Sequence, residues 1–211
     1  MAVNIHILKA SGTLEKFEDA IVSAFEGGLS EVTNKITLPS VDVVIDDNGS
    51  SAIPETGVGG FAPSAHLLYI HINPEFKDIE QRLGSEIRST LTHELHHCAC
   101  WAARGYGKTL LEALISEGLA DHFDIEVNGG EPKLWSVAIS SVELARLLDK
   151  AKSEFGNDSY DHAAWFFGSK EKDIPRWAGY SLGFSLVDDY LKKNNKKASE
   201  LVAADAFSFV A

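Results

Sequence analysis

The sequence predicts an α+β fold whose first part combines strands with a helix and whose second part is helical throughout. Two observations support this prediction. Strand-like alternation of apolar and polar residues occurs only before residue 78, and after it apolar residues recur at helical spacing. No proline- or serine-rich linker separates the two parts, so we expect one domain over residues 1–211 with a lobe boundary at about 78–104.

Three segments of the first part have the pattern of strands. "VNIHIL" (3–8) alternates, and "VDVVI" (41–45) is followed by the turn-forming "DDNGS". "HLLYIHINP" (66–74) alternates until it ends at proline. The glycine-rich stretch "ETGVGGFAPSA" (55–65) runs into this third strand.

Helical spacing of apolar residues predicts the remaining elements. The first helix is expected to end at Gly27 and Gly28, because glycine is common just after a helix C-terminus. The predicted helices lie at about 13–29, 78–103, 109–125, 136–154, 159–168 and 178–193, with a short one near 197–206.

The formal net charge of −12 disfavours anionic partners. Nucleic-acid binding depends on clustered basic residues, and the only basic run, residues 192–197, is typical of a solvated helix end. No apolar stretch reaches the roughly 20 residues of a transmembrane helix, and the first residues lack the features of a secretory signal. We expect a cytoplasmic protein with no nucleic-acid or membrane partner. Cys98 and Cys100 point to different helix faces, so no disulfide is expected.

Residues 91–101, "LTHELHHCACW", give the predicted central helix two distinct faces. At 100° per residue, Leu95 falls about 40° from Leu91, whereas His93 and His97 fall near 200° and 240°. One face is therefore apolar, and the opposite face carries two imidazoles.

Histidines four positions apart are stacked one helical turn apart, so both rings can reach one zinc ion. His93-Glu94-x-x-His97 matches the HExxH signature, in which the glutamate is the general base that acts on zinc-activated water. His96 lies off the line that joins the pair, which favours packing or hydrogen bonding over ligation. The alternative interpretation is a helix whose histidines are solvated or satisfied in the core.

The next predicted helix offers a third ligand. "RGYGK" (104–108) contains two glycines that suit a tight reversal, so the helices on either side should form an antiparallel hairpin. His97 and Glu117 each lie about ten residues, or about 15 Å, from its centre, and should therefore meet. Glu117 would complete a His₂Glu zinc site with the fourth position left to water.

The same arithmetic, carried one turn further, pairs Asp121 with His93. Asp121 would then accept a hydrogen bond from the outer ring N–H of that histidine and fix its tautomer. The alternative interpretation treats Glu117 and Asp121 as exposed acids of an amphipathic helix.

The "HELHH" and "EGLAD" segments, twenty-four positions apart at 93 and 117, resemble the HExxH-plus-ExxxD pattern of thermolysin-like zinc peptidases, the gluzincins. More narrowly, "GVGGFAPSAHLLYIHINP", "THELHH", "LLEALISEGLADHF" and "PRWAGYSLGFSLVDDYL" resemble a family of predicted bacterial zinc-dependent proteases over residues 57–191. One departure from thermolysin is Ser116, where that enzyme has an asparagine.

The resemblance implies a zincin-like metalloprotease fold. In this fold a small mixed sheet forms the N-terminal lobe over the active-site helix, a helical C-terminal lobe lies below, and substrate binds in the groove between. It also implies that His93, His97 and Glu117 hold zinc and that Glu94 is the base.

Stabilisation of the developing oxyanion needs a donor besides zinc. Tyr180 is the first candidate, because the resemblance places its segment after the zinc hairpin; the alternative is ordinary core packing. Arg176 and His162 are weaker alternatives, and Arg176 is also a candidate for substrate binding. Gly59 and Gly60 would let an extended substrate approach an edge strand, as in zincins; the alternative is that these glycines only form a turn.

The sequence therefore predicts a zinc-dependent peptidase that acts on peptide or protein substrates. One alternative is a zinc-stabilised binding or chaperone-like domain without catalysis. A helical interaction protein without metal is a second alternative, and zinc content would separate it from the other two.

Overall fold

A computed structural model describes residues 2–105 and 107–211 of the chain. It divides into two compact units, Met1–Ala103 and Arg104–Ala211. The α+β fold class is confirmed: the first unit contains a small sheet with helices, and the second unit contains helices. The expectation of a single domain stays a prediction. Within the described part of the chain, no helix is both long enough and apolar enough to cross a membrane.

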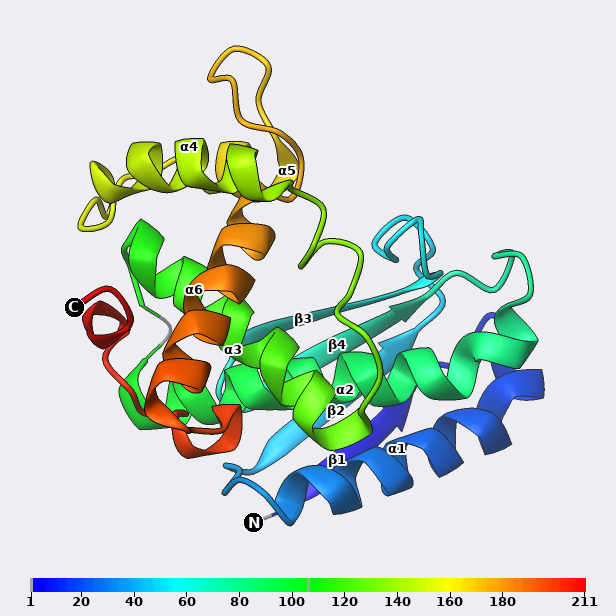
Figure 1. Cartoon of the computed structure of the whole chain (residues 1–211). Coiled ribbons are helices and arrows are strands. Elements are labelled where there is room, and N and C mark those ends of the chain that lie inside the picture. The colour runs from blue at the N-terminus through cyan, green and yellow to red at the C-terminus, as the bar shows by residue number, and fades with distance from the viewer. Residues whose placement is uncertain (1, 106) are drawn as a thin grey trace. The chain divides into compact units, whose positions relative to one another are not determined.

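The first unit is built on a four-stranded mixed sheet with the order β1-β2-β4-β3 (Figure 1). Strands β1 and β4 run parallel to β2, whereas β3 runs antiparallel to β4. The elements of this unit are β1 (Val3–Ile7), α1 (Glu18–Thr33), β2 (Val41–Asp46), β3 (Val58–Ser64), β4 (Leu67–Ile72) and α2 (Ile79–Arg104).

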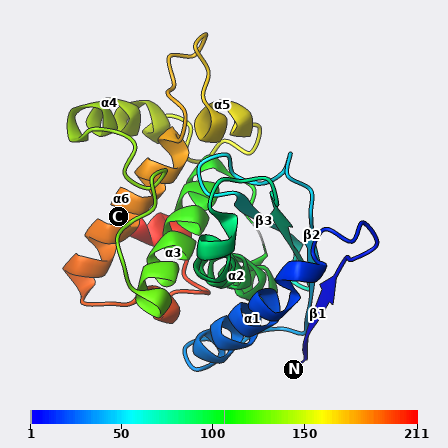
Figure 2. The ribbon, with the colours of Figure 1, turned by 90° about the vertical axis from the view of Figure 1, so that its right-hand side faces the viewer.

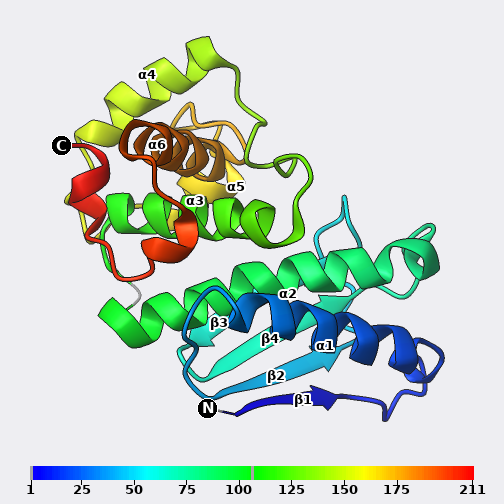
Figure 3. The ribbon, with the colours of Figure 1, turned by 60° about the horizontal axis from the view of Figure 1, so that its bottom comes forward.

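Both α1 and α2 cover the same face of the sheet (Figure 3). Alternation along the strands explains this arrangement, because every second residue of β2 and β4 is buried and the residues between are more exposed. Val43, Ile45, Leu68 and Ile70 are fully buried and form the centre of this core. All three predicted strands are confirmed.

The glycine-rich stretch 55–65, which carried no strand pattern, contains the edge strand β3. Glycine and proline are depleted in strands, so the local sequence does not predict β3. Hydrogen bonding to β4 makes this segment a strand in spite of its low strand propensity. Trp101 of α2 donates a hydrogen bond from Nε1 to the Ala62 carbonyl (3.3 Å), which ties the outer strand to the helix.

The predicted end of the first helix at Gly27 and Gly28 is wrong, because α1 continues to Thr33. A Cβ placed on Gly28 would lie 3.3 Å from Cδ2 of Leu91 on α2. The glycine therefore permits close packing of two helices here and does not end one of them.

Helices make up the second unit (Figure 2). Thr109 caps the first of them: its side chain accepts from the Glu112 amide, while the Glu112 carboxylate accepts from the Thr109 amide. The helix predicted at 136–154 begins later, because Ser140 is its N-cap. The helices are α3 (Leu110–Asn128), α4 (Ser141–Lys152), α5 (His162–Phe167) and α6 (Ala178–Asn194), with 3-10 turns at Ala198–Glu200 and Ala206–Phe209.

Helices α3 and α6 cross with their backbones in contact. A Cβ on Gly118 would lie 2.2 Å from the carbonyl oxygen of Gly183, and a Cβ on Gly183 would lie 2.0 Å from that of Leu114. Only glycine fits at either position, and the crossing fixes α3 immediately after Glu117. In the predicted reversal at 104–108, both glycines have positive φ, and Tyr106 lies outside the described residues.

Candidate metal centre

Helix α2 has the two faces that its sequence predicts. Leu91 and Leu95 are fully buried in the core of the first unit. His93 is half-buried and His97 is 5% exposed. The apolar face thus packs against the sheet, and the two imidazoles lie on the face that does not contact the sheet.

The rings of His93 and His97 meet through their Nε2 atoms, which lie 3.0 Å apart. The ring planes are inclined at 77°, with centroids 4.7 Å apart. Two nitrogens bound to one tetrahedral zinc ion at about 2.1 Å would lie about 3.4 Å apart. The spacing of this pair is therefore close to the spacing that one zinc ion requires.

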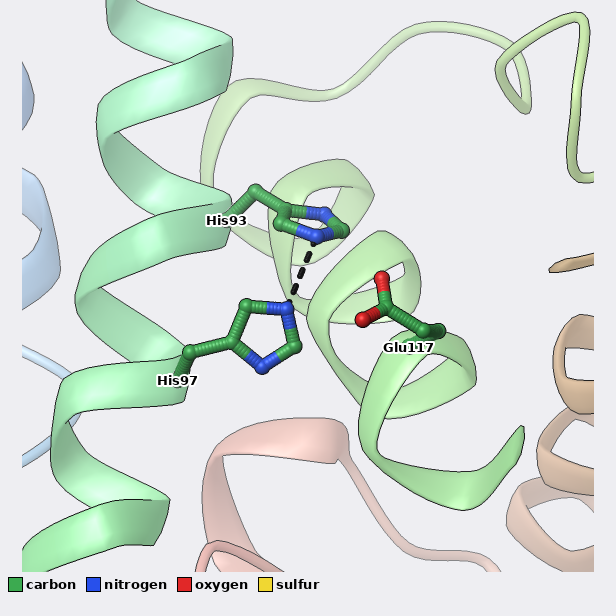
Figure 4. A group of neighbouring side chains, drawn as sticks. All are labelled: His93, His97 and Glu117. Atoms are coloured by element: carbon green, nitrogen blue, oxygen red, sulfur yellow. Dashed lines mark hydrogen bonds between the residues drawn. The ribbon is translucent and has the colours of Figure 1, made fainter. Parts of the chain in front are cut away.

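Glu117 of α3 adds an oxygen donor to this pair. One ligand atom from each of His93, His97 and Glu117 lies within 4.8 Å of the other two, and Figure 4 shows the carboxylate directed toward the imidazoles. Two imidazoles and one carboxylate are a donor set that zinc accepts in hydrolases. In residues 2–105 and 107–211, this is the one group of three or more such side chains close enough to hold an ion.

Glu94 points toward the edge strand and is only 6% exposed. A Cβ placed on Gly60 would lie 2.6 Å from Cγ and 2.7 Å from Oε1 of Glu94, and 2.6 Å from Cγ2 of Thr90. The Glu94 side chain therefore rests against the backbone of β3 in space that only glycine leaves open. Because both residues lie in the first unit, the sheet itself positions this carboxylate.

Gly59 faces a different part of the first unit. A Cβ at Gly59 would lie 2.7 Å from the carbonyl oxygen of Ser51, so this position packs against the 51–53 connection. Of the two glycines predicted to contact substrate, Gly60 is the one beside Glu94. Substrate contact by either glycine stays a prediction.

His96 has a partner within α2, and Cys98 lies against the Ser64 carbonyl of β3. His96 is fully buried, and its Nδ1 lies 3.6 Å from Sγ of Cys100. Burial and the negative charge of Glu94 raise the pKa of the Cys98 thiol to about 12. Zinc binds the thiolate form, so the protonated Cys98 is a poor ligand.

Asp121 lies one turn beyond Glu117 on α3 and is 2% exposed. Its Oδ2 accepts a hydrogen bond from Ser136 Oγ (2.6 Å), and its Oδ1 accepts one from Trp135 Nε1 (3.3 Å). Neither partner was anticipated, because the sequence pattern predicted a helix from about 136, where the structure has the connection between α3 and α4. The predicted role of Asp121 toward His93 stays a prediction.

Comparison with known protein families also points to zinc. A family model described as "Predicted Zn-dependent protease" (DUF2268) matches residues 21–211. The chain belongs to this family. Searches among curated proteins and among solved structures returned no match.

The family match includes both helices that carry the donor group. Zinc is the cofactor named in the description of these predicted Zn-dependent proteases, and His93, His97 and Glu117 form the group that could bind it. The likeness identified from motifs over 57–191 extends to residue 21 at one end and to residue 211 at the other.

In this member of the DUF2268 family, Tyr180 lies in the first turn of α6, half-buried among aromatic rings. Its ring centroid is 5.0 Å from that of Phe166 and 6.5 Å from that of Trp135. Arg176 is exposed, and its guanidinium stacks 4.0 Å from the Trp177 ring centroid. Both positions agree with packing roles, and their catalytic roles stay predictions.

Tyr160, which the sequence did not single out, is close enough to Glu117 for the charge of that carboxylate to affect its pKa. The hydroxyl of Tyr160 is 3.0 Å from Nδ1 of His162. Burial, together with the negative charges of Glu117 and Glu112, raises the pKa of Tyr160 to about 12. Partial burial lowers the pKa of His162, although the charges of Glu117 and Asp161 oppose this shift. At neutral pH the phenol is protonated and the imidazole is neutral.

Proposed function

We propose that this chain is a zinc peptidase of the HExxH, gluzincin type, with His93, His97 and Glu117 as the metal ligands. The observation that carries the proposal is the convergence of two imidazoles and one carboxylate. A second carboxylate, that of Glu94, is buried and follows His93 in the sequence. The arrangement of the first unit, a mixed sheet packed on the helix that carries the histidines, also favours a zincin-like fold.

Zinc, when bound, would polarise the scissile carbonyl and lower the pKa of a water molecule. Glu94 takes the proton from the attacking water and passes it to the leaving amine. Its low exposure and its seat against Gly60 hold the carboxylate in one place, so that little reorganisation accompanies the transfer.

Asp121 is proposed to accept the outer ring N–H of His93 and so to fix the tautomer that leaves Nε2 as the ligand atom. The helix spacing supports this role, because Asp121 follows Glu117 by one turn and His93 precedes His97 by one turn. Peptide or protein is the proposed substrate, with Gly59, Gly60 and Arg176 as candidate contacts.

Two tyrosines are candidates to donate a hydrogen bond to the developing oxyanion. Tyr180 is the candidate from the sequence, and Tyr160 gains support from its pairing with His162 and from the nearby charge of Glu117. If the imidazole donates from Nδ1 to the Tyr160 oxygen, the phenol proton is left to be donated to substrate. A phenol with a pKa of about 12 keeps that proton throughout the neutral range.

Glu94→Gln tests the proposal directly. The amide keeps the shape of the side chain but cannot accept the proton, and general acid–base catalysis typically contributes about 10²–10⁴-fold. We expect the variant to retain zinc and to cleave a peptide library at least about 100-fold more slowly. Unchanged cleavage by Glu94→Gln would remove Glu94 from the mechanism.

The alternative of a zinc-stabilised binding or chaperone-like domain gives a different result. Such a protein would melt at a lower temperature after chelation, because loss of a bound ion removes its stabilisation. It would cleave nothing in either state. Cleavage of unfolded proteins that stops on chelation and returns with zinc supports the peptidase.

A further inference from the structure

The connection between α3 and α4 holds both oxygens of the Asp121 carboxylate. Ser136, which is 3% exposed, donates from Oγ to Oδ2 at 2.6 Å. Trp135 donates from Nε1 to Oδ1 at 3.3 Å. Adjacent residues thus contact the two oxygens of one buried side chain, and the carboxylate plane cannot rotate without breaking one of the two bonds.

This connection is itself fixed to the helices of the second unit. Ser181 of α6, which is 1% exposed, donates from Oγ to the Trp135 carbonyl at 2.8 Å. The Ser136 amide donates to the Lys133 carbonyl at 3.0 Å, and Lys133 Nζ lies 3.5 Å from Oδ2 of Asp124 on α3. Residues 133–136 are therefore attached to α3 and to α6, and these attachments restrict the movement of the residues that hold the Asp121 carboxylate.

Burying polar groups in such a network costs free energy, because they lose their contacts with water, and an apolar core does not carry this cost. Polar groups removed from water must each find a partner, and apolar residues of similar size would often serve the fold as well. Two hydrogen bonds do not exhaust a carboxylate, which offers about four lone-pair positions. A carboxylate fixed in this way can direct its other lone pairs at a constant angle toward a further donor.

We propose that Ser136 and Trp135 are positioning residues of the metal site, which orient Asp121 so that Asp121 in turn orients a histidine ligand. The inference rests on the proposed function, in which Asp121 accepts from His93. Neither Ser136 nor Trp135 contacts the metal or the substrate in this role. They act through the carboxylate.

The test measures the affinity for zinc alone, by competition with a chromophoric chelator, in the full chain and its variants. Removal of outer hydrogen-bond partners of metal ligands typically weakens metal binding by about 10–100-fold. We expect Ser136→Ala to weaken zinc binding about tenfold. Ser140→Ala is the matched control, because it removes a serine hydroxyl from the same connection, the N-cap of α4, without contact to Asp121. It should leave the zinc affinity unchanged.

Trp135→Phe provides a second variant that keeps a ring beside Tyr180 and removes only the indole N–H. It should weaken zinc binding several-fold, and it decides the matter if Ser136→Ala does not fold. A purely structural network predicts lower melting temperatures with wild-type zinc affinity in the folded variants, and this result would overturn the inference.

Glu117→Ala separates this inference from the proposed function. If Glu117→Ala binds zinc as tightly as the wild type, the proposed metal site is wrong. If Glu117→Ala loses zinc while Ser136→Ala and Trp135→Phe keep full affinity, the metal site stands and the positioning role is refuted.

Discussion

Gly60→Ala should impair catalysis without removing the metal. The added methyl would lie 2.6 Å from Cγ of Glu94 and 2.6 Å from Cγ2 of Thr90. Carbon atoms pack at about 3.5–4.0 Å, so one or both side chains must move by about 1 Å. The β3 backbone cannot easily retreat, because Gly60 pairs with Ile70 of β4 and Ala62 is bonded to Trp101.

A displacement of this size falls on the proposed general base. Misplacement of a catalytic group by about 1 Å can cost about 100-fold in rate, and overpacking of a core costs about 1–3 kcal/mol in unfolding free energy. We therefore expect kcat/KM to fall about 100-fold, mostly in kcat, with unchanged zinc content. Steady-state cleavage of a fluorogenic peptide and metal analysis of the same preparation measure both quantities.

Gly84→Ala is the matched control for this substitution. Gly84 lies in α2, and a Cβ there meets nothing within 4 Å. Alanine favours a helix by up to about 1 kcal/mol over glycine, so this variant should be as active as the wild type and slightly more stable. Wild-type kcat/KM in Gly60→Ala, with Gly84→Ala behaving as expected, would show that Glu94 is not the positioned base.

Two further predictions concern the second unit. If Tyr160 donates to the oxyanion, Tyr160→Phe will lower kcat and the affinity for a phosphonamidate transition-state analogue while KM and zinc content stay the same; the same losses in Tyr180→Phe alone would assign the role to Tyr180. Burial lowers the pKa of His122 below its usual 6.5, so the folded state takes up this proton less readily than the unfolded chain. The contribution of the neutral His122 ring to the free energy of unfolding is therefore fully present above about pH 6.5 and declines as the pH falls below that value. Denaturant unfolding of metal-free protein should show this decline between pH 7.5 and 5.5 and a shallower one in His122→Phe, and equal slopes would contradict the assignment.

Local patterns predicted those parts of the molecule whose information is local. Helices α2, α3 and α6 begin within one residue of their predicted starts, because apolar periodicity lies within each segment and Thr109 caps α3. The i, i+4 spacing of His93 and His97 is likewise a property of one helix. The placement of Glu117 near the two histidines could be predicted from the lengths of two helices and the reversal between them.

Features that depend on distant partners were not predictable in this way. Strand β3 is defined by pairing with β4, and its Gly60 is explained only by the Glu94 side chain above it. Gly28 has the local pattern of a helix end, but its role is to let Leu91 approach. Ser136 lies in an irregular connection, and its importance comes from Asp121, fifteen positions earlier.

Zinc content tests the central claim most directly. The protein should be expressed without added metal, purified without a histidine tag and analysed for metals, alongside Glu94→Gln and Glu117→Ala. The proposed site predicts about one zinc per chain in the wild type and in Glu94→Gln, and a clear loss in Glu117→Ala. Wild-type protein that contains no zinc and binds none on addition, or zinc retained in full by Glu117→Ala, would contradict it.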